Sequence, residues 1–234
     1  GHAAGVPVVF DAAHAFGATL AGRPVGHGGV AEVFSLTPTK TLVAGEGGLV
    51  ATADDALAEA LRWNRDYGHR GDYNTRVAGL NARMSEMHAA TALAGLPRFD
   101  ETLAARRAHA SRYVETLAAV PGIHPQTVGA GDESTYKDFT ISIDPEQFGT
   151  GRDDLEAALR AEGVETRRYF FPPVHRQDAY RDHTTDLPIT DRVASRVLTL
   201  PLYAAMPAGG PEQVAELIAA VQAHAGQLTP AASR

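Results

Sequence analysis

The sequence contains no cysteine among its 234 residues. Disulfide bonds, iron–sulfur clusters and thiolate zinc sites are therefore excluded. A net charge of −7 gives no electrostatic support to nucleic-acid binding. No apolar run is long enough to cross a bilayer, so we expect a cytoplasmic protein with no membrane-spanning part.

Several common catalytic and nucleotide-binding motifs are also missing. No G-x-G-x-x-G follows a strand-like run, no G-x-S-x-G is present, and the ten histidines include no H-E-x-x-H. The glycines of Gly45–Gly48 follow a lysine, whereas those of a nucleotide-hydrolase phosphate loop precede it. A nicotinamide site, an acyl hydrolase and a nucleotide hydrolase are thus unsupported, and we expect no metal.

The hydropathy pattern predicts a mixed α/β chain in two parts. The expected strands cover residues 6–10, 31–36, 48–51, 136–143 and 164–171. The expected helices cover residues 56–65, 84–96, 99–119, 152–162, 191–198 and 211–225. One helical turn is expected at 11–16, a tight turn at 20–26, an exposed loop at 67–80 and a frayed end at 229–234.

An aspartate and a lysine lie just beyond strand-like runs. Asp11 follows Val8-Val9-Phe10 at the carboxyl end of the first run, where ligands bind in open α/β sheets. Lys40 lies between a second apolar run and the glycine-rich turn, and burial there would lower the pKa of its amine. Singly, Asp11 is explained as a helix cap and Lys40 as a surface lysine. Together they favour pyridoxal phosphate, which requires a lysine for its aldehyde and a carboxylate for its ring nitrogen.

Polar side chains near these two residues extend the candidate site. His14 lies three residues after Asp11, on the same side of the expected helical turn, and could bond the cofactor's phenolic oxygen or serve structure alone. The hydroxyls of Ser35 and Thr39 could reach a phosphate or simply stabilise a turn.

Two further segments carry candidate ligand contacts. Asn81 and Arg83 end the polar loop, where they could reach a phosphate or a partner chain, or merely precede a helix cap. Tyr169 and His175 flank an aromatic-proline turn, which could line a sugar or nucleotide pocket or form a packed corner.

Six motifs taken together resemble the DegT/StrS family of pyridoxal-phosphate-dependent sugar aminotransferases. In chain order they are FDAAHAFGA, SLTPTK, AGEGG, NARMSE, RRYFFPPVH and VLTLPLY. Each is weak alone, but the ordered set covers nearly the whole chain. The resemblance implies the aspartate-aminotransferase-like α/β fold (fold type I). Residues 1–105 would be part of the large domain with its connecting helix, and residues 106–234 the small α+β domain.

The same resemblance implies roles for the candidate residues. Lys40 would be the catalytic lysine that bonds the cofactor, Asp11 would hold its ring nitrogen, and Ser35 would contact its phosphate. Asn81 would reach the phosphate of the neighbouring subunit's cofactor in a homodimer. His14 would contact the cofactor, although glutamine is usual at its position.

The implied substrate is a nucleotide-linked deoxysugar whose keto group receives an amino group, usually from glutamate. Tyr169, His175 and Arg83 are expected near this substrate. A family branch with histidine in place of the lysine is a dehydratase, so Lys40 resembles the aminotransferase branch. A sugar dehydratase and a regulatory homologue that binds without turnover are the alternatives.

The chain begins with Gly1 and enters a strand-like run almost at once. The family's chains are longer at this end, so we expect that an N-terminal part with the phosphate-binding turn is missing. We therefore expect these 234 residues alone to bind the cofactor poorly.

Overall fold

The computed structural model describes residues 1–183 and 185–227. The chain divides into two compact units, Gly1–Ala104 with Val128–Lys137, and Ala105–Thr127 with Asp138–Arg234. None of the described helices is long and apolar enough to span a membrane. The fraying expected at 229–234 lies outside the described residues.

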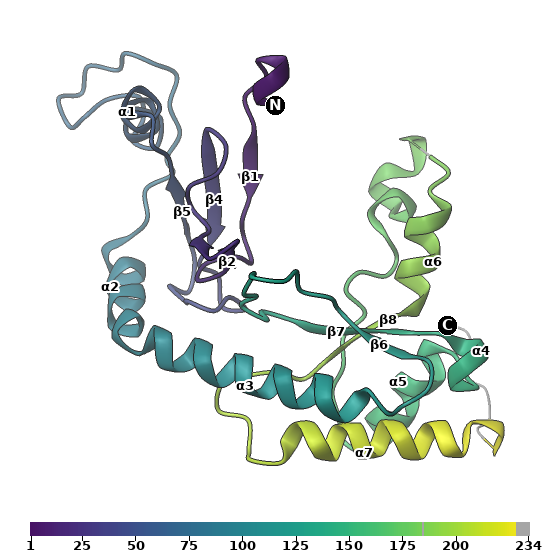
Figure 1. Ribbon diagram of the computed structural model, residues 1–234. Coiled ribbons are helices and arrows are strands. Elements are labelled where there is room, and N and C mark those ends of the chain that lie inside the picture. Colours follow the sequence, from purple (N-terminus) through teal and green to yellow (C-terminus); the bar gives the residue numbers. More distant parts are fainter. Residues whose placement is uncertain (184, 228–234) are drawn as a thin grey trace. The chain divides into compact units, whose positions relative to one another are not determined.

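The first unit is built on a three-stranded sheet, in which β4 lies between β1 and β5 (Figure 1). The strands are β1 (Val9–Asp11), β4 (Ala31–Ser35) and β5 (Gly48–Ala51). β1 and β4 are parallel, with Asp11 opposite Val33, whereas β4 and β5 are antiparallel. Because parallel strands end at the same edge, the residues that follow β1 and β4 begin side by side.

A small hairpin follows β1 and is fixed by residues distant in sequence. Its strands are β2 (Thr19–Leu20) and β3 (Arg23–Pro24), and Ala21 and Gly22 between them both have positive φ, as a two-residue hairpin turn requires. The tight turn predicted at 20–26 is therefore confirmed. Thr19 and Glu133 exchange two backbone hydrogen bonds, which explains why 128–137 belongs to this unit.

Helices complete the first unit. They are the 3-10 helices η1 (His2–Ala4) and η2 (Leu96–Arg98), α1 (Asp55–Asn64), α2 (Glu86–Gly95) and the first part of α3 (Phe99–Leu117). The Asp54 carboxylate accepts the backbone N–H groups of Ala56 and Leu57, and the Ser85 hydroxyl accepts that of His88. These N-caps satisfy amides that the first turn of each helix leaves unpaired.

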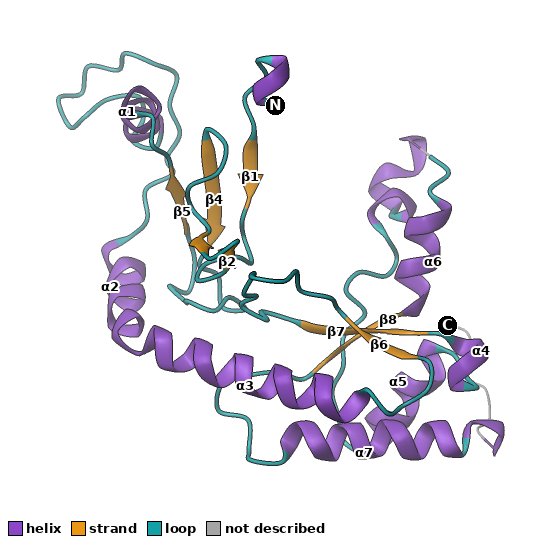
Figure 2. Cartoon of the chain, in the orientation of Figure 1, coloured by secondary structure: helices purple, strands orange, loops and turns teal. Residues whose placement is uncertain are grey.

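The second unit contains an antiparallel sheet with β7 in the centre. Its strands are β6 (Ile123–Pro125), β7 (Phe139–Ile143) and β8 (Val197–Leu200), and its helices are α4 (Pro145–Phe148), α5 (Arg152–Ala161), α6 (Pro188–Arg196), α7 (Gly210–Ala223), η3 (Val174–Arg176), η4 (Asp178–His183) and η5 (Ala225–Gln227) (Figure 2). Phe139, Ile141 and Ile143 are all buried, as their alternation predicts. The ring of Tyr113 on α3 stacks on Phe139 at 4.8 Å.

Two local predictions are wrong, and the bounds of a third are shifted. Residues 164–171 do not form a strand: Arg167 makes a single bridge to Thr199, and the chain then turns. The helix predicted at 191–198 begins at Pro188 and ends at Arg196, because Val197–Leu200 pairs with β7 as β8. Pairing with a strand more than 50 residues away overrides local helical spacing, which is why β8 was not predicted.

The helical turn predicted at 11–16 is also absent. Two tight turns replace it, closed by hydrogen bonds from Ala15 N–H to the Ala12 carbonyl and from Ala18 N–H to the Ala15 carbonyl. The Asp11 side chain favours this geometry by accepting the Ala13 amide. His14 therefore does not share a helical face with Asp11, contrary to the prediction.

Candidate functional site

Asp11 is the last residue of β1. One of its carboxylate oxygens accepts a hydrogen bond, and the other could accept one from a ligand. Its Oδ1 accepts the Ala13 N–H at 3.0 Å, and the Ala12 N–H continues the sheet by donating to Val33 at 2.9 Å. The described chain offers no hydrogen bond to Oδ2, and the side chain is exposed. The turn-forming role and a ligand-binding role are thus compatible in one residue.

Ser35 ends β4 at the same sheet edge. Its hydroxyl oxygen lies 3.1 Å from that of Thr37, and the Thr37 N–H donates to it at 3.4 Å. Ser35 therefore pairs with Thr37, whereas Thr39, the other hydroxyl proposed for a phosphate, is exposed farther along the loop. Two adjacent hydroxyls and a backbone amide form a small cluster of hydrogen-bonding groups.

Lys40 lies in the loop between β4 and β5, which contains no helix or strand (Figure 2). Both ends of this loop are anchored, since Leu36, Leu42 and Ala44 are buried in one cluster with Phe99 and Leu103. Residues 37–41 project between these anchors, and the Lys40 amide donates to the Thr37 carbonyl at 3.0 Å. The lysine side chain is half-buried.

The loop that carries Lys40 is bonded to the loop that follows Asp11. The Thr41 hydroxyl donates to the Phe16 carbonyl at 3.2 Å. The Phe16 ring packs edge-on against Phe34 at 5.7 Å and against Phe99 at 5.2 Å. The neighbours of Lys40 and Asp11 are therefore joined by both a polar contact and aromatic packing.

His14 is exposed, and its backbone carbonyl accepts the Thr135 hydroxyl at 2.8 Å. Its place in the first unit is thus set by the distant segment 128–137 rather than by a helix. Asn81 and Arg83 are also exposed, in the segment after α1. Asn81 forms a backbone bridge with Asp66, and the Arg83 guanidinium lies 3.3 Å from the Asp66 carboxylate.

Tyr169 and His175 belong to the second unit. The half-buried Tyr169 ring contacts Phe170 at 4.8 Å. The His175 side chain is 9% exposed, and its Nε2 lies 2.8 Å from Asp191. Arg176 donates to the same carboxylate at 2.7 Å, and this bond lowers the pKa of Asp191. His175 also lines a hollow of about 360 Å³ with Tyr180.

Arg152, which sequence reasoning missed, supports the aromatic-proline turn. It is 4% exposed, donates to the Ala194 carbonyl at 2.8 Å and lies 4.6 Å from the Phe171 ring centre. An arginine that opens an amphipathic helix gives no hint of burial, because this position is normally exposed.

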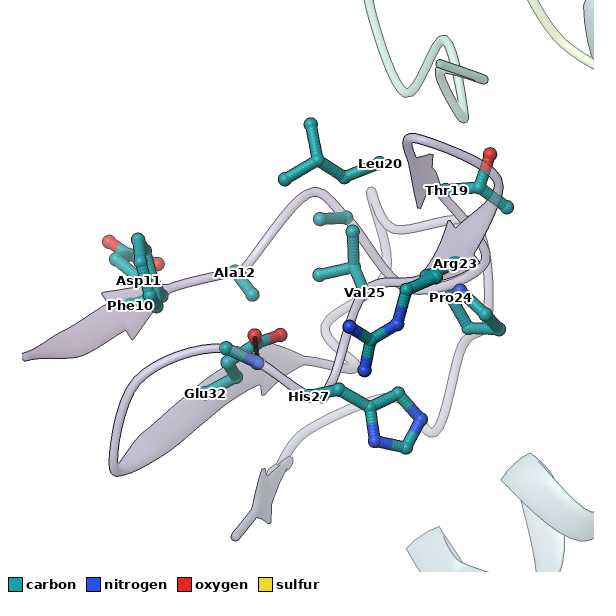
Figure 3. Close-up of a pocket in the computed structure, with 12 residues that line it drawn as sticks. Phe10, Asp11, Ala12, Thr19, Leu20, Arg23, Pro24, Val25, His27 and Glu32 are labelled. Atoms are coloured by element: carbon teal, nitrogen blue, oxygen red, sulfur yellow. Dashed lines mark hydrogen bonds between the residues drawn. The ribbon is translucent and has the colours of Figure 1, made fainter. Parts of the chain in front are cut away.

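Glu32 is a second residue that sequence reasoning missed. It is buried on β4, beside a hollow that Figure 3 shows together with Arg23 and His27. The signal was present, since strict alternation from buried Phe34 places Glu32 on the same face.

The fold is that of a known protein family. The family model of the DegT/DnrJ/EryC1/StrS aminotransferases matches residues 1–222, so the chain belongs to this family. A solved structure of an aminotransferase of this family from Brucella abortus superposes with a TM-score of 0.86 at 27% identity, over 94% of this chain and 58% of that one. The predicted fold class and family are thus confirmed.

Particular relatives are similar over most of this chain. A dTDP-3-amino-3,4,6-trideoxy-alpha-D-glucose transaminase from Streptomyces venezuelae is 36% identical over 85% of this chain and 52% of its own length. A pleiotropic regulatory protein from Geobacillus stearothermophilus is 34% identical over 94% of this chain and 59% of its own. The chain thus spans little more than half the length of these curated relatives.

Proposed function

We propose that the protein acts as a pyridoxal-phosphate-dependent aminotransferase that transfers an amino group, from glutamate, to the keto group of a nucleotide-linked deoxysugar. The observation that carries this proposal is the common sheet edge of β1 and β4, where Asp11, Ser35 and the loop of Lys40 meet. Membership of the aminotransferase family and similarity to a dTDP-sugar transaminase support it.

The side chains at this edge fit the proposed cofactor. The free oxygen of Asp11 would accept the ring N–H, and the hydroxyls of Ser35 and Thr37 would donate to the phosphate. The amine of Lys40 would bond the aldehyde, and His14 would add a contact from the neighbouring turn. When bound, the cofactor supplies an electron sink for charge that develops at the donor's α-carbon.

Lys40 would act as the base after the amino group of the donor has displaced it from the aldehyde carbon. The freed Nζ would take the proton from the α-carbon of the amino donor, and such positioned proton transfer typically contributes about 10²–10⁴-fold to the rate. Asp11, as an anion facing the ring nitrogen, would stabilise that nitrogen's proton. The hydrogen bond between Thr41 and Phe16 would keep Lys40 and Asp11 at a fixed separation.

For the substrate, the favoured contacts are Tyr169, His175 and Arg83. His175 lines a hollow and is oriented by Asp191, and its neighbour Tyr180 offers an aromatic surface of the kind that stacks on sugars and bases. Exposed Asn81 would reach a partner subunit in a cytoplasmic homodimer. Residues 1–105, joined by 128–137, would then carry the cofactor as part of a large domain, and the rest of 106–234 would form the small one.

Borohydride trapping tests the role of Lys40 directly, because the sequence has only two lysines, Lys40 and Lys137. Protein incubated with excess pyridoxal phosphate, which compensates for the weak binding expected of these residues alone, is reduced with borohydride, digested and analysed by mass spectrometry. We expect the cofactor mass on the peptide with Lys40 in the unmodified protein and in Lys137→Arg, and its loss in Lys40→Ala. Labelling of Lys137 alone, or equal labelling of both lysines, would contradict the assignment.

A regulatory role without turnover is the second candidate, favoured by the similarity to a pleiotropic regulatory protein. Product analysis separates the two candidates. An aminotransferase converts a nucleotide-linked keto sugar to an amino sugar with loss of glutamate, and a regulator binds the sugar without that change.

A further inference from the structure

The first unit contains a hollow of about 400 Å³ beside the β2–β3 hairpin. Phe10, Leu20 and Val25 contribute apolar walls, and Figure 3 shows Arg23 and Glu32 on its lining, from β3 and β4. The volume lies within the range of small-molecule sites. Lys40 is not among the lining residues, whereas Asp11, the proposed ring-nitrogen partner, lies at the border of the hollow.

Glu32 gives the hollow a buried acceptor. The residue is 4% exposed, and its Oε1 accepts the Gly28 N–H. Its Oε2 is buried and has no hydrogen-bond partner within residues 1–183 and 185–227. Buried polar atoms nearly always have a partner, and a carboxylate oxygen without one is strongly unfavourable. The oxygen is therefore suited to a hydrogen-bond donor that enters the hollow.

Arg23 gives the hollow a charge of the opposite sign. Its side chain is exposed, and the described part of the chain supplies no hydrogen-bond or ion-pair partner to its guanidinium. A guanidinium binds carboxylates through paired hydrogen bonds. Asp11 and His27 also line the hollow, so its polar groups carry both signs of charge around an apolar interior.

We propose that this hollow binds a free aliphatic α-amino acid. The ammonium group donates to Glu32 Oε2, the carboxylate accepts from Arg23, and the side chain packs on Phe10, Leu20 and Val25. An anion alone would be repelled by Glu32, and a cation alone would be repelled by Arg23. A zwitterion with an apolar side chain satisfies both charged groups and the walls together.

Binding of L-leucine, measured by titration calorimetry without added cofactor, tests this site. Two analogues share its side chain: 3-methylbutylamine lacks the carboxylate, and 4-methylpentanoate lacks the amine. We expect saturable binding of one L-leucine per chain and at least about tenfold weaker binding of each analogue, because each leaves one charged group unmatched. Equal binding of all three, or no binding of L-leucine up to about 10 mM, would overturn the proposal.

Variants identify the location of the bound amino acid. Glu32→Gln and Arg23→Gln should each weaken L-leucine binding by about tenfold or more, whereas Arg62→Gln, an exposed arginine on α1, should not. Lys40→Ala should bind L-leucine normally, which would show that this binding does not depend on the proposed catalytic lysine. Loss of binding in Lys40→Ala with normal binding in both charged-group variants would refute the site. If Glu32→Gln fails to fold, the variant Arg23→Gln at an exposed residue and the two analogues still test the site.

Discussion

The Thr41 hydroxyl donates a hydrogen bond to the Phe16 carbonyl, with 3.2 Å between the two oxygens. Thr41 follows Lys40, and Phe16 lies five residues beyond Asp11. One contact therefore links two loops that carry the proposed catalytic lysine and the proposed ring-nitrogen partner. The loops are 25 residues apart in sequence, and β1 and β4 bring them together by parallel pairing.

Replacing Thr41 by valine should weaken this link while keeping the side-chain shape. We expect Thr41→Val to lower the free energy of unfolding by about 1 kcal/mol, because the Phe16 carbonyl loses its donor. Trp63, the only tryptophan, lies in the same unit, so its fluorescence in urea reports the change. Thr41→Ser keeps the hydroxyl and should restore most of the loss.

The same link should affect the lysine's chemistry. In borohydride trapping, Thr41→Val should label Lys40 more slowly than the unmodified protein and Thr41→Ser. If Thr41→Val labels at the unmodified rate although its stability falls, the bond stabilises the fold without positioning Lys40.

Gly17 should be far less tolerant of alanine than Gly22, although both have positive φ. A Cβ on Gly17 would lie 2.6 Å from the Phe99 ring, whereas one on Gly22 would meet nothing within 4 Å. We expect Gly22→Ala to cost about 1–2 kcal/mol from backbone conformation, and Gly17→Ala about 1–3 kcal/mol more from the clash. Urea unfolding followed by Trp63 fluorescence measures both. Equal losses would show that the Phe99 ring moves aside freely.

Much of the fold follows from local sequence signals. The alternation of Phe139, Ile141 and Ile143 is typical of a strand and agrees with β7, and Asp54 is a residue type that favours the N-cap position it has in α1. Strand β8 was missed because Val197–Leu200 continues the spacing of a helix, and only pairing with β7 distinguishes the two. Residues 128–137 could not be assigned to the first unit either, since their bonds to Thr19 and His14 span more than 100 residues.

The residues of the candidate site likewise fall into those that the sequence predicts and those that it does not. Asp11, Ser35 and Lys40 were predicted because each lies at or beyond the carboxyl end of a strand-like run, where ligands bind in open α/β sheets. Thr41 was not, since a threonine after a lysine is unremarkable until Phe16 is placed beside it. Glu32 was overlooked because a charged residue in an apolar run is usually on the exposed face, and here Gly28 and the hairpin cover it.

Glu32→Gln should stabilise the protein in the absence of a ligand. The amide keeps an acceptor for Gly28 but removes a buried charge that has no partner for Oε2 in the described residues. We expect the free energy of unfolding to rise by about 1 kcal/mol. Glu32→Ala, which also removes the acceptor and leaves a void, should lower it, and Glu46→Gln at an exposed site should change little. A loss of stability in Glu32→Gln would mean that the carboxylate is compensated.

Asp11→Asn should separate cofactor binding from catalysis. Asparagine can still accept the Ala13 amide, so the turn after β1 and the trapping of cofactor on Lys40 should persist. The neutral side chain cannot stabilise a proton on the ring nitrogen as an anion does. In an active enzyme that contains these residues, we therefore expect Asp11→Asn to lower turnover at least about 100-fold. Unchanged turnover would remove Asp11 from the proposed role.

Asp191 should make the second unit sensitive to acid. The Arg176 guanidinium, with a smaller contribution from His175, lowers the pKa of the Asp191 carboxyl below its ordinary value of 3.8. A carboxyl whose pKa is lower in the folded state stabilises that state above the unfolded value, and this stabilisation is lost as pH falls through the folded value. The loss should therefore occur below about pH 4.

Asp191→Asn tests this dependence by thermal unfolding at several pH values. The variant should melt below the unmodified protein at pH 6, and the difference should shrink as pH falls toward 3, because the unmodified carboxyl then becomes neutral as well. Asp182→Asn, at an exposed carboxylate in the neighbouring η4, serves as the matched control and should show no such convergence. A constant difference across the pH range would mean that Asp191 contributes through shape and neutral hydrogen bonds, rather than through its charge beside Arg176 and His175.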